Sequence, residues 1–240
     1  MKINLYKYAL NLLYPLKCQI CKAKLEVENT RHICLHCRRK IKINLPPFCL
    51  KCGKSRTQGL SDTTCRECKE NRYLFDRAWA VSIYEGVIKE CLRLFKYRKK
   101  RRLLKLFSEL ACNFMERFID YQPIDLISAV PLSKNKMRQR EFNQSGLLAR
   151  EIGGEFKKTV LNDNLIKIKD TPSQVTLSGA KRRLNLTGAF KAKEPRLFKD
   201  KNILLIDDVF TTGSTLNECS EVLKKAGAKK VYALALARGS

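Results

Sequence analysis

The stretch that decides the fold is Ile203–Thr215, which reads ILLIDDVFTTGST. Its first four residues are apolar and predict a short buried strand over 203–206. The carboxylates of Asp207 and Asp208 follow at the expected end of that strand. A loop of small residues comes next, and an amphipathic helix is expected over 216–226. The small polar residues of this loop are Thr211, Thr212, Gly213, Ser214 and Thr215.

This order of elements suits a phosphorylated sugar. The start of a helix offers unpaired N–H groups and a partial positive charge to a phosphate. Gly213 permits the positive φ that wraps backbone amides around an anion. Asp207 and Asp208 would accept hydrogen bonds from ribose hydroxyls. The alternative is an ordinary strand–turn–helix with an incidental acidic pair, although adjacent carboxylates rarely serve packing. A P-loop nucleotide site is disfavoured because the chain has no Gly-x-x-x-x-Gly-Lys-Ser/Thr.

The charge of the chain points to an anionic partner. The 240 residues include 49 Lys and Arg against 23 Asp and Glu, a net charge of +26. Nucleic acid, a nucleotide or an acidic membrane surface would suit this charge. No apolar run approaches the roughly 18 residues of a membrane span. Residues 1–16 predict an amphipathic helix that docks on the body, with peripheral contact to the inner membrane as the alternative. We expect a cytoplasmic protein with reduced cysteines.

Eight of the eleven cysteines fall into four Cys-x-x-Cys pairs, and the pattern repeats about every 31 residues. Each pair directs two thiolates at one ion, and two pairs complete a closed tetrahedral site. We predict two structural zinc ions, paired most simply in sequence order, with an interleaved pairing as the alternative. His32 and His36 are expected to be surface residues. The predicted ligands are Cys18, Cys21, Cys34, Cys37, Cys49, Cys52, Cys65 and Cys68.

From Arg77 onward, apolar runs alternate with amphipathic helical patterns. Such alternation predicts a parallel sheet flanked by helices, with ligands at the carboxyl ends of its strands. We therefore expect a zinc-binding module over 1–70 and an α/β domain over 71–240. The expected strands are 78–84, 126–130, 203–206 and 231–237, and the expected helices are 86–97, 103–121, 143–152 and 216–226.

A second anion-binding turn is expected after the strand at 126–130. Backbone amides and fixed cations in this turn would hold a diphosphate. The alternative is a solvated basic loop. The predicted residues of the turn are Pro131, Leu132, Ser133 and Lys134, with Lys136, Arg138 and Arg140 as further cations.

Three blocks of the chain carry a resemblance to known families. Residues 203–215 are similar to the phosphoribosyl diphosphate signature of type I phosphoribosyltransferases. The segments VPLSKNKMRQREFNQSGLLA at 130–149 and QVTLSGAKRRLNLTGAF at 174–190 resemble the ComF competence family, in which an N-terminal cysteine-rich module also occurs. One departure is Glu141, which stands where the family pattern has glycine.

The resemblance implies a type I phosphoribosyltransferase-like fold that binds Mg-phosphoribosyl diphosphate. Asp207 and Asp208 would hold the ribose hydroxyls, Thr211 to Thr215 the 5′-phosphate and Pro131 to Lys134 the diphosphate. The segment from Gln174 to Asn185 would close over the site, and Arg182 and Lys96 would contact the diphosphate. The resemblance also implies a role in natural transformation, in which single-stranded DNA enters the cytoplasm with a helicase-like translocation partner and a recombination mediator.

Whether transfer to an acceptor occurs is left open by the sequence. The resemblance places Thr211 where purine-salvage enzymes carry a catalytic Asp, which disfavours 6-oxopurine transfer. One alternative is a non-catalytic adaptor for single-stranded DNA, and another is a nucleobase salvage phosphoribosyltransferase. For the adaptor, the densest cluster of positive charge would contact the phosphate backbone. That cluster is Arg98, Lys99, Lys100, Arg101 and Arg102, and the alternative for it is a solvated face.

Overall fold

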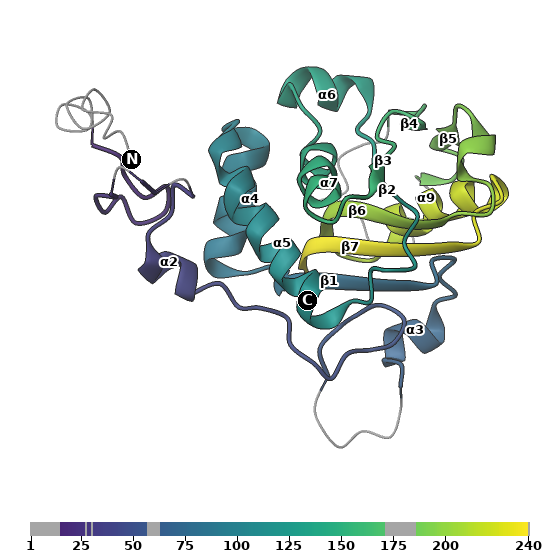
Figure 1. The fold of residues 1–240 in the computed structure, drawn as a ribbon, viewed down its shortest axis with the longest axis horizontal. Helices are drawn as coiled ribbons and strands as arrows, with labels where there is room; N and C mark the ends of the chain where they lie inside the picture. Colours follow the sequence, from purple (N-terminus) through teal and green to yellow (C-terminus); the bar gives the residue numbers. More distant parts are fainter. Residues whose placement is uncertain (1–14, 27, 30, 57–62, 171–185, 240) are drawn as a thin grey trace.

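The computed structural model describes residues 15–26, 28–29, 31–56, 63–170 and 186–239. The predicted helix at 1–16 and the predicted closing segment at 174–185, with Arg182, lie wholly or largely outside these residues. Two short helices belong to the cysteine-rich part, and an α/β unit follows (Figure 1). In chain order the elements are α2 Leu35–Arg39, α3 Arg66–Glu70, β1 Arg77–Ile83, α4 Gly86–Tyr97, η1 Arg101–Leu103, α5 Leu104–Phe118, β2 Leu126–Ala129, α6 Lys134–Arg140, α7 Gln144–Glu155, β3 Thr159–Val160, β4 Leu165–Lys167, β5 Phe190–Ala192, η3 Pro195–Phe198, β6 Asn202–Phe210, α9 Ser214–Lys225 and β7 Lys230–Arg238.

Five strands form one parallel sheet in the order β1-β7-β6-β2-β3. The sheet confirms the predicted fold class, with β6 between β7 and β2. Because successive side chains of a strand point to opposite faces, the run at 203–206 serves both sides of the sheet. Leu204 and Ile206 pack into one core, whereas Ile203 and Leu205 pack into the other.

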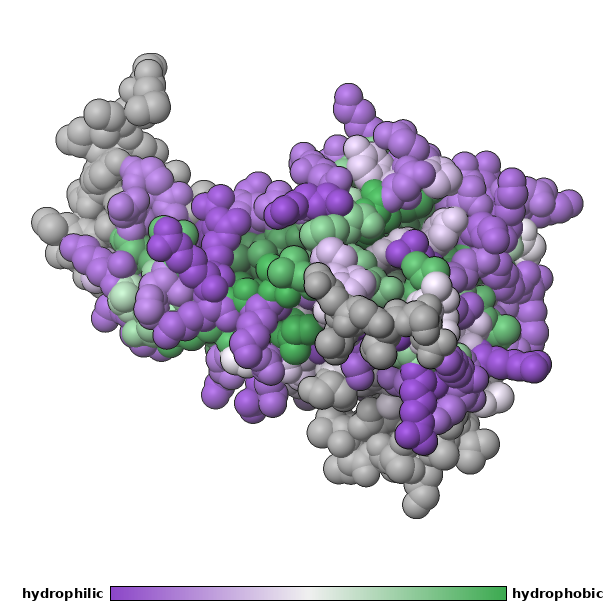
Figure 2. Space-filling model, turned by 90° about the horizontal axis from the view of Figure 1, so that it is seen from below, coloured by the Kyte–Doolittle hydropathy of each residue, from purple (hydrophilic) through white to green (hydrophobic). Residues whose placement is uncertain are grey.

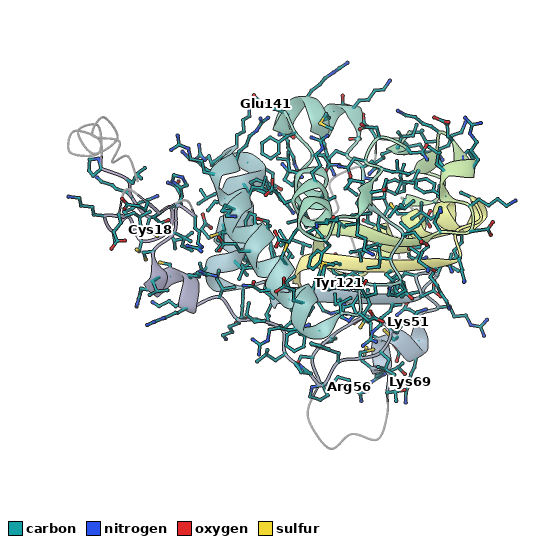
Figure 3. All side chains as sticks on the ribbon, in the orientation of Figure 1. Cys18, Lys51, Arg56, Lys69, Tyr121 and Glu141 are labelled. Atoms are coloured by element: carbon teal, nitrogen blue, oxygen red, sulfur yellow. The ribbon has the colours of Figure 1, made fainter. Side chains whose placement is uncertain are left out.

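The first core lies between the sheet and helices α4, α5 and α7. Apolar residues of all three helices are fully buried there, including Leu92, Phe107 and Ile152. Cys18 and Ile33 of the first cysteine repeat belong to the same cluster. The first repeat therefore packs beside α4 and α5, as the position of Cys18 in Figure 3 shows.

The second core lies on the other face of the sheet, beneath α9. Leu216 and Leu223 of α9 pack there, together with the antiparallel pair of β4 and β5. Cys49 and Cys52 of the second cysteine repeat are fully buried in this cluster. Figure 3 places Lys51 and Lys69 of that repeat below β1, away from Cys18. The first repeat therefore packs on one face of the sheet, and the second repeat packs on the other face.

Three local predictions were wrong. The strand at 203–206 continues to Phe210, because β7 pairs with β6 as far as Phe210 and Arg238. Asp207 and Asp208 consequently lie within β6 instead of after it. Residues 134–140, expected as part of a loop, form α6, whose N-cap is Ser133. The helix escaped prediction because KNKMRQR has no apolar stripe.

The surface is strongly polar. In the view of Figure 2, hydrophilic side chains cover much of the described part, with a hydrophobic area near the middle of that face. None of the described helices has the length and apolar character that a membrane span requires.

Candidate functional site

The acidic pair lies at the centre of the site. Asp207 is only 9% exposed, and its Oδ1 accepts a hydrogen bond of 2.8 Å from the backbone N–H of Asp208 and one of 3.4 Å from Ser145 Oγ. Burial, followed by the charge of Asp208, raises the pKa of Asp207 to about 7. Nζ of Lys96 on α4 lies 2.7 Å from Oδ1 of Asp208. Lys96 therefore lies at the site, as expected. In this structure it pairs with the carboxylate of Asp208, whereas the sequence predicted a contact with the diphosphate.

The predicted phosphate loop connects β6 to α9. Gly213 adopts a φ of +73°, as its position in the loop requires. The hydroxyls of Thr212 and Ser214 lie 2.8 Å apart, and the Ser214 N–H points at Thr212 Oγ1 over 3.4 Å. Ser214 and Thr215 begin α9, a helix of 12 residues, so its first N–H groups face the loop. Thr211 is exposed at the start of the loop. This geometry suits an anion at the start of the helix.

The predicted diphosphate turn lies beside the acidic pair, because β2 and β6 are neighbours in the sheet. Pro131 and Ser133 are buried, Leu132 is half-buried and Lys134 is exposed. The side-chain amide of Asn143 donates to the carbonyl of Val130 over 3.0 Å and fixes the entry to the turn. The turn and the loop at 211–215 thus stand at the same edge of the sheet, where parallel sheets bind ligands.

Two further lysines face this edge from other elements. Burial is the main cause that lowers the pKa of Lys136 on α6, and the nearby charges of Arg140 and Lys96 lower it further. Burial and the charge of Lys136 lower the pKa of Lys167 on β4 to about 8. Half-buried ammonium groups that repel one another are stabilised by an anionic ligand. Sequence reasoning missed Lys167 and Ser145, because only the tertiary fold brings them to the site.

The eight paired cysteines form two groups, and within each group the sulfur atoms lie within 4.8 Å of one another. The groups follow sequence order, so the simplest pairing was correct and the interleaved one was wrong. Sulfur atoms of Cys21 and Cys34 lie 3.6 Å apart, and those of Cys52 and Cys65 lie 3.7 Å apart. A tetrahedron with zinc–sulfur bonds of about 2.3 Å has edges of about 3.8 Å. Both groups therefore fit zinc, as structural sites closed by four thiolates.

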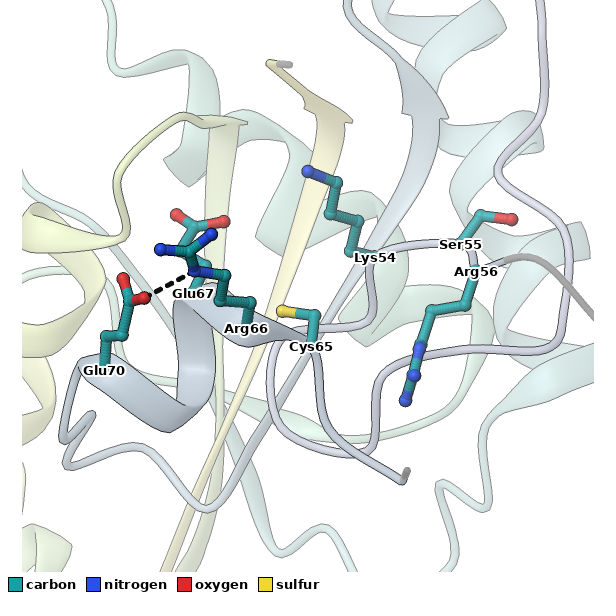
Figure 4. Close-up of a pocket in the computed structure, with 7 residues that line it drawn as sticks. All are labelled: Lys54, Ser55, Arg56, Cys65, Arg66, Glu67 and Glu70. Atoms are coloured by element: carbon teal, nitrogen blue, oxygen red, sulfur yellow. Dashed lines mark hydrogen bonds and ion pairs between the residues drawn. The ribbon is translucent and has the colours of Figure 1, made fainter. Parts of the chain in front are cut away.

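The two histidines of the first repeat are not in either group. His32 is half-buried and His36 is exposed. A hollow of about 460 Å³ lies on the second repeat, between α3 and the segment at 54–56 (Figure 4). Its lining carries charges of both signs and does not include Asp207 or Asp208. The lining residues are Lys54, Ser55, Arg56, Cys65, Arg66, Glu67 and Glu70.

The basic run at 98–102 lies in the break between α4 and α5. Lys99 has a φ of +53°, which ends α4, and η1 begins at Arg101. Arg101 lies over the ring of Phe142 at 4.5 Å, and Lys99 pairs with Glu141. All five residues of the run are exposed. The run therefore forms a turn that connects α4 to η1 and α5.

Comparison with known proteins agrees with this architecture. Residues 9–69 match the family model of a double zinc ribbon domain, and residues 147–240 match that of a phosphoribosyl transferase domain. Competence protein F of Haemophilus influenzae is 29% identical over 229 residues, which cover 94% of this chain and 98% of the relative. Competence protein ComFC of Bacillus subtilis is 28% identical over 217 residues, covering 86% and 84%. The chain is thus similar to ComF competence proteins over most of its length.

A third relative is the DNA utilization protein YhgH of Escherichia coli strain K12, 26% identical over 95% of this chain and 99% of the relative. Among solved structures, the glutamine phosphoribosylpyrophosphate amidotransferase of B. subtilis aligns with a TM-score of 0.42 and 15% identity, over 60% of this chain and 30% of that one. A hypoxanthine phosphoribosyltransferase from Staphylococcus aureus aligns with a TM-score of 0.36 and 18% identity, over 56% and 62%.

The structure also explains why the ComF sequence pattern has a glycine where this chain has Glu141. Glu141 caps α6 with a φ of +68°, in the left-handed region that glycine adopts without strain. Here a carboxylate side chain occupies that position and pairs with Lys99. The departure therefore leaves the turn in place and adds a contact to the basic run.

Proposed function

We propose that this competence-associated protein binds Mg-phosphoribosyl diphosphate and supports the entry of single-stranded DNA into the cytoplasm. The observation that carries the proposal is a buried acidic pair directly before a Gly213 loop at a helix start. Lys96 pairs with Asp208, Lys136 lies near the same carboxylate, and Lys167 lies near Lys136, so all three supply positive charge to this region. One edge of the sheet thus offers cations for the phosphate groups of the ligand and carboxylates for its ribose hydroxyls.

Each part of the proposed ligand has a suitable partner. Asp207 and Asp208 accept hydrogen bonds from the ribose hydroxyls, and the loop at 211–215 binds the 5′-phosphate. The turn at 131–134, with Lys136 and Lys167, binds the diphosphate. Carboxylate and phosphate oxygens are the ligands that Mg²⁺ prefers. When bound, Mg²⁺ would offset the negative charge of the diphosphate.

The biological part of the proposal rests on the relatives, whose names refer to competence and DNA utilization. We place the protein in the cytoplasm, where a helicase-like translocation partner and a recombination mediator would pass single-stranded DNA. The zinc-binding part, over about 1–70, and the phosphoribosyltransferase-like part, over 71–240, would act as one unit because they share both cores.

A second candidate function is a single-stranded DNA adaptor that does not need the phosphoribosyl pocket. A cavity of about 270 Å³ between the first cysteine repeat and the basic run favours it. Gln19, His32 and residues 99–103 line this cavity. The side chains of Lys100 and Arg102 have no hydrogen-bond or ion-pair partner among the described residues, so they are free to bind phosphate.

Replacement of the ComF-family gene of a naturally transformable bacterium by variants of this one separates the two functions. We expect Asp207→Ala with Asp208→Ala to reduce transformation at least tenfold while protein level and zinc content stay normal. An adaptor would tolerate that change and would instead lose function when Lys100 and Arg102 are both changed to Ser. Normal transformation by the acidic-pair variant contradicts the proposed function.

A further inference from the structure

Arg238, the last residue of β7, carries a buried charge that connects the sheet with the second zinc site. Only 4% of the residue is exposed. Its Nη2 lies 3.0 Å from Oε2 of Glu67 on α3, and its Nη1 donates to the carbonyl of Cys52 over 3.3 Å. Both partners belong to the second cysteine repeat, and Cys52 is itself a zinc ligand in our assignment. The hydrogen bonds of the guanidinium therefore go to the second cysteine repeat.

The same guanidinium lies over the ring of Phe210, 4.2 Å from its centroid. Phe210 is the last residue of β6 and pairs with Arg238 in the sheet register. The Phe210 ring lies directly against Gly213 of the phosphate loop, because a Cβ added to Gly213 would come within 2.8 Å of the ring. The ring therefore leaves no room for a side chain at this position. Arg238 thus contacts the second zinc site on one side and, on the other, the Phe210 ring that lies against the loop at 211–215.

A second connection runs through the segment that follows the last zinc cysteine, Cys68. The Tyr73 hydroxyl donates to the carbonyl of Thr212 over 3.0 Å, and the Leu74 N–H donates to Asn217 Oδ1 over 2.7 Å. Rings of Tyr73 and Phe75 stack at 4.8 Å, and Phe75 meets Phe210 edge-on at 6.1 Å. The loop is thus bounded by residues whose position depends on the fold of the second repeat.

The first zinc site has no comparable connection among the described residues. Its repeat packs into the first core through Cys18 and Ile33 and pairs with Glu109 on α5 through Arg31 and Arg38, without a contact from its described residues to the loop at 211–215. These packing and ion-pair contacts lie on the opposite face of the sheet from α9. The two zinc sites, similar in sequence, therefore differ in what they support.

We propose that the second zinc site positions the phosphate loop, through the contact of Arg238 with the Phe210 ring and through the hydrogen bond from Tyr73 to Thr212. Arg238 and Tyr73 are positioning residues, since neither faces the acidic pair. The ligand part of this inference rests on the proposed function, because it assigns the 5′-phosphate to the loop at 211–215. The structural part, control of the loop by the second repeat, stands independently of any ligand.

Hydrogen exchange of the zinc-loaded protein tests the structural part. We expect Arg238→Met and Tyr73→Phe to speed amide exchange at 211–217 about tenfold or more, with two zinc ions retained and exchange in α5 unchanged. Glu109→Gln, which breaks the contact of the first repeat, should leave exchange at 211–217 unchanged. If Arg238→Met does not fold, Tyr73→Phe alone decides. Unchanged exchange at 211–217 in the folded variants overturns the proposal.

Two simple ligands test the positioning role. Ribose 5-phosphate probes the loop at 211–215, whereas inorganic diphosphate with Mg²⁺ probes the turn at 131–134. We expect Arg238→Met to weaken ribose 5-phosphate about tenfold and to leave diphosphate unchanged, and Arg238→Lys to restore part of the loss. Equal weakening of both ligands would mean a general structural defect and would overturn the positioning role. If the unaltered protein binds neither ligand, the proposed function fails, and the exchange result still decides the structural inference.

Discussion

Nζ of Lys96 lies 2.7 Å from Oδ1 of Asp208, although the two residues are 112 positions apart. Their side chains are only 13% and 15% exposed. The pair places a positive charge next to Asp207 and Asp208, whose carboxylates repel each other. It therefore helps to hold two acidic groups together at the edge of the sheet before any ligand arrives. The same contact connects α4 with the central strand β6.

Removal of Lys96 should destabilise the protein, because Asp208 would lose its partner in a largely buried position. We expect Lys96→Met to lower the free energy of unfolding by about 2–4 kcal/mol. Urea unfolding of the zinc-loaded protein measures this. Lys99→Met is the matched control, since it breaks an exposed pair with Glu141 and should change stability little. Equal stability of the Lys96 variant and the unaltered protein would contradict the role of the pair.

The raised pKa of Asp207 predicts a stability cost that grows with pH. The carboxyl has an ordinary pKa of 3.8 and a folded value of about 7, so the folded state favours its protonated form. Stability is therefore lost as pH rises from about 4 to about 7 and stays low above that range. Asp207→Asn removes this loss.

Between about pH 5.5 and about pH 8, we expect the stability of Asp207→Asn to rise relative to the unaltered protein by about 2 kcal/mol. Urea unfolding of both proteins at the two pH values gives the comparison, and any effect of pH on zinc cancels between them. A relative stability that does not change with pH would mean that Asp207 is not perturbed.

The lowered pKa of Lys167 predicts that anion binding weakens above neutral pH. Burial and Lys136 lower this pKa from 10.5 to about 8, so Lys167 loses its proton as pH rises through that value. The affinity for phosphoribosyl diphosphate should fall as pH rises above about 8, by at most about tenfold per unit, because the protonated form binds the anion more tightly. Titrations at about pH 7 and about pH 9 would show this.

Lys167→Arg should keep its charge over that range and bind with little pH dependence, since the guanidinium does not titrate. Lys169→Met, a change at an exposed residue near β4, should retain the pH dependence of the unaltered protein. An identical pH profile for Lys167→Arg and the unaltered protein would exclude Lys167 as the titrating group.

The left-handed backbone of Glu141 predicts a stabilising substitution. Glu141→Gly relieves the strain at a φ of +68°, whereas Glu141→Ala removes the same side-chain contact with Lys99 and keeps the strain. We expect the glycine variant to unfold about 2–4 °C above the alanine variant in a thermal scan. A glycine variant that unfolds at or below the temperature of the alanine variant would contradict this account of the turn.

Local patterns were sufficient to predict much of the architecture. The apolar run at 203–206 predicted the central strand, and the repeated Cys-x-x-Cys pairs predicted two groups of four sulfur atoms. The helix expected over 86–97 has the bounds of α4. Such elements have a clear hydrophobic period or a fixed ligand spacing, so they can be recognised from the local sequence without knowledge of the tertiary structure.

The missed features depend on contacts between distant segments. Ser145 joins the site only because α7 packs against β6, and Lys167 only because the fold brings β4 close to Lys136 of α6. Nothing near either residue in sequence indicates this. The extension of β6 to Phe210 follows from pairing with β7. The buried charge of Arg238 needs Glu67 and Cys52 of the second repeat, both more than 170 residues away. Local sequence carries no signal for partners of this kind.

Calorimetric titration of phosphoribosyl diphosphate into the zinc-loaded protein, with and without Mg²⁺, tests the central claim most directly. The account predicts micromolar affinity with Mg²⁺ for the unaltered protein, and a loss of at least about 100-fold for Asp207→Ala with Asp208→Ala, roughly 3 kcal/mol or more. Absence of binding in the unaltered protein, or equal binding by both proteins, would contradict a phosphoribosyl pocket at the acidic pair.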